Sequence, residues 1–380
     1  MNYRTKILHT GKDICPYTGA SSIPIYNGST FAQKDPEQFG QYEYSRGSNP
    51  TREALEHTIA IMESGTHGFA YSSGMAAISS VLLLFKPGDH IIAPTDVYGG
   101  TYRALTTLFQ QWGLESTFVD TTDGENIRKA ITPATKALFM ETPSNPLLKI
   151  TDLSAVVEIA KSRNLLTIID NTFMTPYLQR PLELGFDITI HSATKFLGGH
   201  SDLIAGLVAV KDKQLADHLK RIQTTFGAVL GPNDSWLLLR GIKSLSARLD
   251  AEQKTAEAIA NWLVTQPEIK QVFYPTLPKH PGREIHLKQA KGGGAVVSFE
   301  FADGETAKKF LRTIELGLLA VSLGGVETIY SYPATMSHSA MPKKERLARG
   351  ITDGLVRMSV GLEDAEDLKK DIRRALDAAK

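Results

Sequence analysis

A lysine lies among hydroxyl residues and glycines in the stretch His191-Ser192-Ala193-Thr194-Lys195-Phe196-Leu197-Gly198-Gly199-His200. The apolar run from Asp187 to Ile190 just before it predicts a buried strand. Lysine is rarely buried without a partner, so a lysine where a strand runs into a glycine-rich loop needs a functional reason. We interpret Lys195 as a residue that forms a covalent bond, because a lysine amine is a nucleophile when its pKa is lowered.

Two other predicted strands end in residues that could serve the same ligand. In Tyr71-Ser72-Ser73-Gly74-Met75 a strand passes into a helix, where free backbone N–H groups and the helix dipole favour a phosphate. The run Leu166–Asp170 ends in a carboxylate, whose burial is unfavourable unless it meets a cation or several donors. Taken singly, these patterns also suit an ordinary strand-to-helix turn and an aspartate that caps a turn.

A cofactor with an aldehyde, a ring nitrogen and a phosphate would use all three strand ends at once. Lys195 would bind the aldehyde, and Asp170 would keep a heteroaromatic nitrogen protonated. Ser192 and Thr194 would offer hydroxyl donors to the phosphate beside Gly74. These are the requirements of pyridoxal phosphate, so the sequence predicts pyridoxal 5'-phosphate as the cofactor.

Composition narrows the class of protein. Lys and Arg number 42 against 41 Asp and Glu in 380 residues, which leaves no basic field for nucleic acid. The single cysteine, Cys15, excludes an intramolecular disulfide, and the histidines lack metal-ligand spacing, so we expect no metal. The stretch Met1–Thr10 is too polar for a signal peptide, and no apolar run reaches the roughly 18 residues that span a bilayer. We expect a cytoplasmic protein with no membrane partner.

The pattern between Gly68 and Val210 alternates short apolar runs with amphipathic segments. Such alternation predicts an α/β fold with a mostly parallel central sheet flanked by helices. The expected strands are Phe69–Ser72, His90–Ala93, Ser116–Val119, Ala137–Glu141, Leu166–Asp170, Ile188–His191 and Leu203–Val210, and the expected helices are Gly74–Phe85, Gly99–Trp112, Asn126–Ile131 and Leu153–Arg163.

The rest of the chain predicts an arm and a smaller domain. We expect residues 1–45 to form an extended N-terminal arm that packs on a partner subunit, residues 46–240 the large cofactor-binding domain, and residues 241–380 a smaller α+β domain. A long helix from about Asn233 to Leu263 would bridge the two domains. The later strands are expected at Gln271–Tyr274, Ala295–Phe301, Leu319–Val321 and Val356–Gly361, and the later helices at Glu305–Ile314 and Asp364–Ala379.

The chain resembles the Cys/Met-metabolism, or trans-sulfuration, family of fold-type-I pyridoxal-phosphate enzymes nearly from end to end. The motifs that carry this resemblance are Tyr44-Ser45-Arg46 with Asn49-Pro50-Thr51, Ser73-Gly74-Met75-Ala76, Asp96-Val97-Tyr98-Gly99-Gly100-Thr101, Glu141-Thr142-Pro143-Ser144-Asn145-Pro146, Asp170-Asn171-Thr172, Ser192-Ala193-Thr194-Lys195 with Gly198-Gly199-His200, and Ser322-Leu323-Gly324-Gly325. Together they are highly specific.

The resemblance implies a role for each matching residue. Lys195 would hold the cofactor as a Schiff base and act as the catalytic base, with Tyr98 stacked on the ring and its hydroxyl free for proton transfer. The other residues implied to bind the cofactor are Asp170, Gly74, Met75, Ser192 and Thr194, with Tyr44 and Arg46 reaching in from a neighbouring subunit, and those implied to bind the substrate carboxylate are Asn145, Ser322 and Arg357. By pattern alone, Arg357 could also face outward from a strand and Asn145 could be a turn residue. The shared site implies an obligate dimer, usually paired into a homotetramer.

The resemblance also bears on which carbon–sulfur bond is broken. Relatives that act at Cγ commonly carry a glutamate just before Ser-Leu-Gly-Gly, whereas this chain has Val321, and Gly100 replaces the cysteine of methionine γ-lyases. The resemblance therefore favours a cystathionine β-lyase of methionine and cysteine metabolism, which converts L-cystathionine to homocysteine, pyruvate and ammonia. A γ-lyase or γ-synthase on the same scaffold is the alternative, and a non-catalytic binding protein is the alternative from another class.

Overall fold

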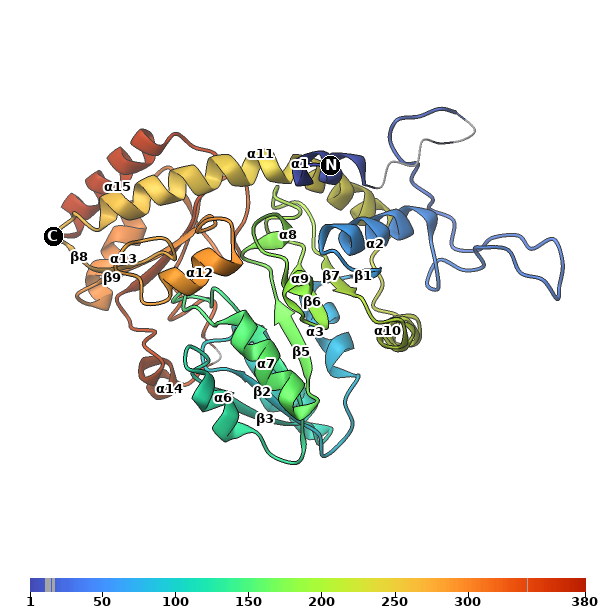
Figure 1. Cartoon of the computed structure of the whole chain (residues 1–380). Coiled ribbons are helices and arrows are strands. Elements are labelled where there is room, and N and C mark those ends of the chain that lie inside the picture. Colours follow the sequence, from blue (N-terminus) through green and yellow to red (C-terminus); the bar gives the residue numbers. More distant parts are fainter. Residues whose placement is uncertain (11–14, 16–17, 340) are drawn as a thin grey trace.

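The chain is represented by a computed structural model that describes residues 1–10, 15, 18–339 and 341–380. Its helices and strands form two sheets with their covering helices, joined by one long helix (Figure 1). The larger sheet has the order β1-β7-β6-β5-β4-β2-β3, from β1 (His67–Tyr71), β2 (His90–Pro94), β3 (Glu115–Val119), β4 (Thr135–Glu141), β5 (Leu166–Asp170), β6 (Ile188–Ser192) and β7 (Gly206–Val210). All pairs among β2 to β6 are parallel, and β7 runs against both of its neighbours, β1 and β6. The predicted mostly parallel sheet is therefore confirmed.

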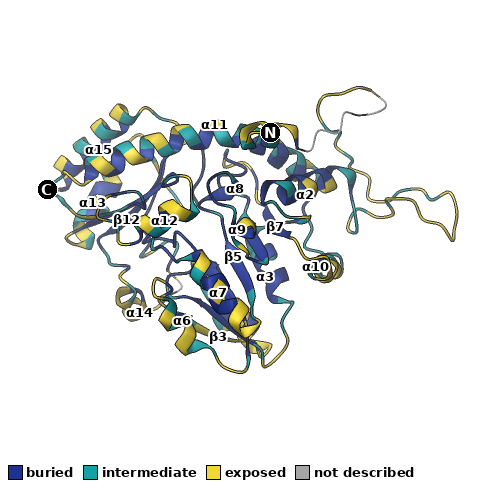
Figure 2. Ribbon diagram, viewed as in Figure 1, coloured by how far each residue is buried: buried dark blue, intermediate teal, exposed yellow. Residues whose placement is uncertain are grey.

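Helices cover both faces of the larger sheet. Neighbouring residues on one strand enter opposite apolar clusters, as Ile168 and Ile169 do on β5. The cluster around Ile169 includes side chains of α2 (Pro50–Met62) and α7 (Leu153–Arg163), and the cluster around Ile168 includes side chains of α3 (Gly74–Leu82) and α10 (Lys213–Phe226). The strands consequently lie buried between helices, except for the edge strand β3, which is partly exposed (Figure 2). Burial on both faces explains why these strands read as continuous apolar runs.

The smaller sheet lies in the C-terminal part of the chain and is mostly antiparallel. Its order is β10-β11-β12-β9-β8, from β8 (Ile269–Phe273), β9 (Val296–Phe301), β10 (Leu318–Leu319), β11 (Ile329–Ser331) and β12 (Leu355–Ser359). Helices α13 (Gly304–Thr313) and α15 (Ala365–Ala379) share its apolar cluster. The expected α+β architecture is confirmed, with β11 as a strand that the sequence pattern did not predict.

The long helix α11 (Pro232–Leu263) links the two parts. Its first half buries Leu238 and Leu245 in a cluster of the larger sheet, and its second half buries Ile259 and Leu263 in the cluster of the smaller sheet. The predicted boundary between the two domains, after residue 240, falls within this continuous helix. It stays a prediction.

The N-terminal segment is not extended throughout. Residues Tyr3–His9 form helix α1, which begins after Asn2 and buries Ile7. The Tyr3 hydroxyl donates to the Met62 carbonyl at 2.6 Å, so this helix packs on its own chain. A periodicity of only two turns was too short to predict it. Beyond it, residues 18–48 are mostly exposed and project from the body (Figure 1), whereas residues 11–14 and 16–17 of the predicted arm lie outside the described residues.

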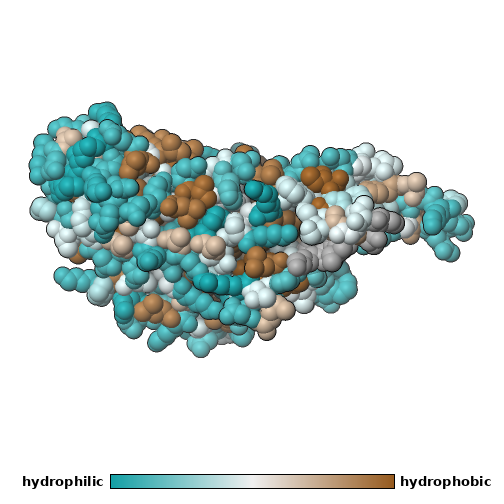
Figure 3. All heavy atoms as spheres, turned by 90° about the horizontal axis from the view of Figure 1, so that it is seen from above, coloured by the Kyte–Doolittle hydropathy of each residue, from teal (hydrophilic) through white to brown (hydrophobic). Residues whose placement is uncertain are grey.

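Several helices differ from the expectation. The expected helix Gly99–Trp112 is divided into α4 (Gly99–Arg103), a π-helical stretch η1 (Ala104–Leu108) and α5 (Phe109–Gln111). Four helices have no predicted counterpart: α8 (Thr175–Leu178), α9 (Pro181–Leu184), α10 and α12 (Arg283–Gln289). Helix α6 (Gly124–Ala130) matches the expected helix Asn126–Ile131, and the short helix α14 spans Lys343–Ala348. No helix within the described ranges is long and apolar enough to cross a membrane. Apolar side chains lie in separate patches among hydrophilic ones on the face seen in Figure 3.

Candidate active site

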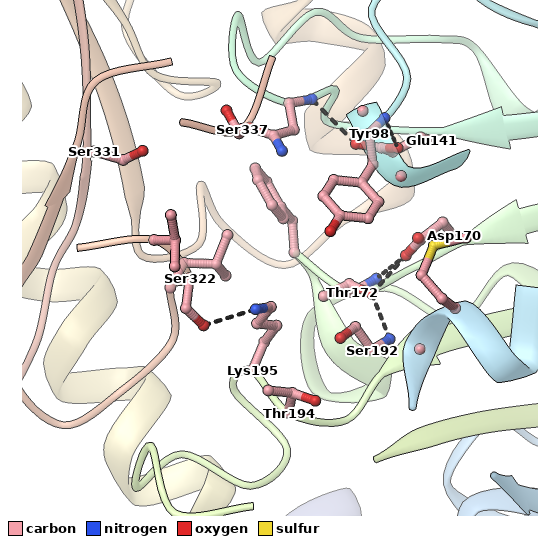
Figure 4. Close-up of a pocket in the computed structure, with 18 of the residues that line it drawn as sticks. Tyr98, Glu141, Asp170, Thr172, Ser192, Thr194, Lys195, Ser322, Ser331 and Ser337 are labelled. Carbon is pink, nitrogen blue, oxygen red and sulfur yellow. Dashed lines mark hydrogen bonds between the residues drawn. The ribbon is translucent and has the colours of Figure 1, made fainter. Parts of the chain in front are cut away.

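A cavity of about 400 Å³ lies where the parallel strands end and the smaller sheet begins (Figure 4). Ten of the twelve predicted site residues line it: Gly74, Met75, Tyr98, Asn145, Asp170, Ser192, Thr194, Lys195, Ser322 and Arg357. Ligands of open α/β sheets bind beyond the carboxyl ends of the strands, and the cavity has this position. The structure thus brings together residues that lie up to 283 positions apart in the sequence.

Lys195 follows β6 on a tightly bonded loop. The Gly199 N–H donates to the Lys195 carbonyl at 2.8 Å, and the Lys195 ammonium donates to the Ser322 hydroxyl at 2.7 Å. A Cβ added at Gly324, whose φ is +75°, would come 2.6 Å from the Phe196 nitrogen, so only glycine lets the Ser322 loop approach this closely. Burial, and then the positive charge of Arg357, lower the pKa of Lys195 to about 8, although Asp170 acts in the opposite direction. The lysine is therefore prepared to act as a neutral amine.

Asp170 ends β5 as a buried carboxylate. The backbone N–H and the hydroxyl of Thr172 donate to its Oδ1 at 3.0 and 2.5 Å, and the Thr172 hydroxyl accepts from the Ser192 N–H at 2.8 Å. Burial raises the pKa of Asp170, and the two hydrogen bonds from Thr172 act against that rise. A protonated ring nitrogen beside Asp170 would add the positive charge that a buried carboxylate needs to stay ionised.

The first turn of α3 faces β6 at close range. The Ser73 hydroxyl accepts from the Ala76 N–H at 3.0 Å, which caps the helix. A Cβ added at Gly74 would come 2.8 Å from the Ser192 Cβ, so the close approach requires glycine. Thr194 is fixed by its own hydroxyl, which accepts from the Ala205 N–H at 3.0 Å. Thr194 Oγ1 also donates to the Ala205 carbonyl at 3.3 Å, and rotation of this hydroxyl would let it join the Ser192 hydroxyl and the helix N-terminus as donors to a phosphate.

The wall opposite Asp170 carries a buried cation. Arg357 lies in the middle of β12 and is 2% exposed. Its Nη1 donates to Asn145 Oδ1 at 3.0 Å and its Nη2 to the Ser322 carbonyl at 2.5 Å, and among the described residues its buried Nε has no partner. Burial lowers the pKa of Arg357 to about 10, so the guanidinium stays charged at neutral pH. An unpaired donor on a buried guanidinium fits a ligand carboxylate.

Two predicted cofactor residues lie away from this cavity in the same chain. Tyr44 is 48% exposed, and Arg46 donates to the Thr224 carbonyl at 2.6 Å. The Arg46 guanidinium carbon lies 5.6 Å from the centre of the Tyr44 ring. This position accords with the prediction that the pair serves a neighbouring subunit, which stays a prediction, as do the individual roles of the cavity residues.

The cavity also contains residues to which the sequence assigned no role. Glu141 ends β4 as Asp170 ends β5, and the two are register partners. The same strand-end signal that indicated Asp170 could have found Glu141. Thr172 lies two residues beyond Asp170, where a hydroxyl can return to the carboxylate. Ser337 and Ser339 come from an irregular loop, which has no periodic pattern to place it in the site.

These groups fit pyridoxal phosphate, because one cavity offers an amine, a buried carboxylate and a helix N-terminus suited to a phosphate. The fold and the cavity define the class of fold-type-I pyridoxal-phosphate enzymes. The chain belongs to the Cys/Met metabolism PLP-dependent enzyme family, whose model matches residues 4–377, so the resemblance is confirmed and pyridoxal phosphate is the cofactor.

Curated relatives and solved structures agree with this assignment. The chain is 55% identical to cystathionine beta-lyase MetC of Bacillus subtilis, over 98% of this chain and 95% of the relative. It is 50% identical to cystathionine gamma-lyase of the same organism, over 99% of this chain and all of the relative. The crystal structure of cystathionine gamma-lyase from Lactobacillus plantarum, complexed with L-serine, superposes with a TM-score of 0.98 at 45% identity, over 100% of this chain and 99% of that one. The protein is a PLP-dependent lyase.

Proposed function

We propose that this lyase is a cystathionine β-lyase, which converts L-cystathionine to homocysteine, pyruvate and ammonia. The observation that carries the choice of bond is Val321, which lines the cavity directly before Ser322 and is 67% exposed. In γ-acting relatives the resemblance places a glutamate there, which would meet the distal amino group of the substrate. The 55% identity to a cystathionine beta-lyase supports the same choice.

Arg357 and Asn145 are proposed to bind the carboxylate of the reacting amino acid. The planar guanidinium matches a carboxylate in two hydrogen bonds, and Asn145 orients the guanidinium from the other loop. Ser322 contacts both the proposed base and the proposed carboxylate-binding residue: its hydroxyl accepts from Lys195, and its carbonyl accepts from Arg357. The carboxylate site and the base are therefore connected through one residue, which favours a fixed geometry at the substrate Cα.

Lys195 is proposed to remove the Cα proton once the substrate is bound. When bound, pyridoxal phosphate supplies an electron sink that stabilises negative charge at this carbon. The lowered pKa of Lys195 leaves part of the amine neutral at physiological pH, as a general base requires. Tyr98, which lines the cavity and is 40% exposed, is proposed to give a proton to the departing sulfur. The bond between Cβ and sulfur breaks, and the protonated sulfur leaves as homocysteine. The remaining three-carbon fragment takes up one water to give pyruvate and ammonia.

Cleavage at Cγ is the alternative on the same scaffold. It requires a second proton removal, at Cβ, and the 50% identity to a cystathionine gamma-lyase keeps it open. The alternative from another class, a non-catalytic binding protein, does not agree with the membership of this chain in a family of PLP-dependent lyases, and Lys195, Asp170 and Arg357 all line one cavity.

We also propose a cytoplasmic homotetramer built from dimers that share active sites. The support is the exposed Tyr44 and the projecting segment around it, which leave Tyr44 and Arg46 available to a second subunit (Figure 1). Sedimentation of the holoenzyme tests the tetramer, and cell fractionation tests the location. Because Arg46 would act across the interface, mixing inactive Arg46→Ala with inactive Lys195→Ala subunits should restore part of the activity.

Product identification tests the proposed reaction. The holoenzyme is incubated with L-cystathionine, and the keto acids and thiols are separated and quantified. Pyruvate with homocysteine is the expected result, whereas 2-oxobutyrate with cysteine would show γ-cleavage and contradict the proposal. Lys195→Ala is the matched control, and L-cysteine and L-homocysteine as substrates define the preference.

A further inference from the structure

Two loops that carry proposed site residues are tied together by two buried carboxylates. One loop follows β2 and carries Asp96 and Tyr98, and the other follows β4 and carries Ser144 and Asn145. The Ser144 hydroxyl donates to Asp96 across the gap between the loops. In the opposite direction, the Tyr98 N–H donates to Glu141 Oε2 at 2.9 Å. The loop after β2 therefore supplies Asp96 to Ser144, and the end of β4 supplies Glu141 to Tyr98, so the two segments are linked in both directions.

Glu141 does more than close this link. Its second oxygen, Oε1, accepts from the Asn145 N–H at 3.2 Å, so one carboxylate contacts the backbone of both Tyr98 and Asn145. The side chain lines the cavity and is 5% exposed, and Figure 4 shows it beside Tyr98. Asp96 and Ser144 do not line the cavity.

The orientation of the Tyr98 ring depends on its backbone. Tyr98 is the N-cap residue of α4, and its own N–H, which lies before the first helical turn, has Glu141 Oε2 as its acceptor. A Cβ added at Gly100 would come 2.4 Å from Cε1 of Tyr98, which shows how closely the ring packs on that glycine. With the ring confined on this side, a shift of the Tyr98 backbone must move the ring.

We propose that Glu141 is a positioning residue that sets Tyr98 and Asn145 relative to each other. It thereby couples the stacking of the cofactor ring to the binding of the substrate carboxylate through one side chain. This inference rests on the proposed roles of Tyr98 and Asn145. Asn145 in turn accepts from Arg357, so the effect of Glu141 extends to the guanidinium.

Two opposing effects act on the charge of this carboxylate. Burial and the neighbouring Asp170 raise the pKa of Glu141 well above its usual range, while the hydrogen bonds from Tyr98 and Asn145 act against the rise. Glutamine has the same size and one acceptor oxygen, but its NH₂ group cannot accept a hydrogen bond. Glu141→Gln therefore keeps the packing and breaks one of the two backbone contacts.

The test compares Glu141→Gln with Ser144→Ala as a matched control. Ser144→Ala removes the other hydrogen bond between the loops but leaves both contacts of Glu141 in place. The readouts are the visible circular dichroism of the holoenzyme, the Kd of the apoenzyme for pyridoxal phosphate, and kcat and KM with L-cystathionine. The dichroism reports the asymmetric contacts of the bound cofactor, and a purely structural loosening would lower Tm in both variants alike.

We expect Glu141→Gln to change the dichroism, raise the Kd for pyridoxal phosphate about 10-fold and raise KM about 5-fold, the range of one lost hydrogen bond. Ser144→Ala should lower Tm, while its Kd for pyridoxal phosphate stays within about 2-fold of the wild-type value and its visible dichroism spectrum stays the same. A Glu141→Gln enzyme with wild-type dichroism and Kd overturns the inference, as does a Ser144→Ala enzyme with equal changes.

Two further variants keep the test decisive. If Glu141→Gln does not fold, Glu141→Asp retains the charge but is one methylene shorter and cannot reach both N–H groups, and the same changes are expected of it. Tyr98→Ala is measured alongside. An unchanged cofactor spectrum in Tyr98→Ala would contradict the proposed stacking role and, with it, the inference about Glu141. A changed spectrum in Tyr98→Ala together with wild-type dichroism and Kd in Glu141→Gln would contradict the inference about Glu141 alone.

Discussion

The two walls of the active site are built in different ways. The cofactor wall belongs to the larger sheet, where Asp170 and Lys195 stand at or beyond the carboxyl ends of adjacent parallel strands. The substrate wall belongs to the smaller sheet, where Arg357 projects from the middle of β12 and Ser322 lies in a loop with φ +93°. The first wall follows from the topology of a parallel sheet, and the second depends on how two separate parts of the chain meet.

The two walls also differ in the contacts that hold their functional residues. On the cofactor wall, the residue at a strand end is held by neighbours close to it in the sequence, as Thr172 donates two hydrogen bonds to Asp170. The substrate wall depends on contacts that cross between the parts, because Arg357 donates to Asn145 after β4 and Ser322 accepts from Lys195 after β6. We therefore expect mutations on the two walls to separate cofactor binding from substrate binding.

The largest effect is expected from Lys195→Ala on the cofactor wall. The variant loses both the amine that holds the cofactor and the proposed base, so kcat/KM for L-cystathionine should fall about 10³-fold or more. The visible absorption of the wild-type holoenzyme should also disappear. Steady-state kinetics and absorption spectra measure both, and a variant that keeps its colour and activity would exclude Lys195 from either role.

Arg357→Lys should have the next largest effect, and it should act on the substrate wall alone. Lysine has three donors and no planar fork, so it cannot donate to Asn145 and Ser322 and also bind a carboxylate in two hydrogen bonds, and kcat/KM should fall about 10²-fold. The Kd for pyridoxal phosphate should remain within about 2-fold of the wild type. Equal losses of substrate and cofactor affinity would contradict the separation of the two walls.

The pH dependence of cofactor capture should reveal a coupling between the walls. Lysine reacts as the neutral amine, and with a pKa of about 8 for Lys195 its neutral share rises about fivefold from pH 7 to pH 8 and levels off above pH 9. The rate at which the apoenzyme binds pyridoxal phosphate covalently should follow this rise. Arg357→Met removes a charge that lowers this pKa, so the midpoint should move to higher pH. A midpoint near the ordinary value of lysine in the wild type would contradict the assignment.

The smallest effect is expected from Val321→Glu at the edge of the substrate wall. Val321 is mostly exposed, so the change should fold normally and lower β-cleavage only about threefold. A glutamate there would offer an acceptor to the distal amino group, and 2-oxobutyrate should become detectable. Quantifying both keto acids measures the shift, with Val321→Gln as the uncharged control. An unchanged product ratio would show that Val321 does not select the bond.

The sequence predicted the cofactor wall better than the substrate wall, and the two architectures explain why. Asp170 and Lys195 end apolar runs of the length and composition of buried parallel strands, so their position in the sheet follows from local pattern. Arg357 occupies an ordinary position within such a run, and only the resemblance to the family indicated its role. Its cavity neighbours depend on the long-range packing of two parts of the chain.

The same distinction holds for the fold. The central strands were predicted within a few residues, whereas β11 was not, because Ile329–Ser331 is too short to show a period. Helix α10 was missed because its buried side chains form a narrow stripe, with Ala216, Leu219 and Gln223 at helical spacing among many polar residues. Helix α1 depends on contacts with residues such as Met62 that lie far along the chain.

The most direct test of this account is the site at which the cofactor is attached. Apoenzyme is loaded with pyridoxal phosphate, reduced with borohydride, digested and mapped by mass spectrometry, with Lys195→Ala and Arg357→Lys treated in parallel. We predict one reduced adduct on Lys195 in the wild type and in Arg357→Lys, and no adduct on this peptide in Lys195→Ala. An adduct on another lysine of the wild type would contradict the account.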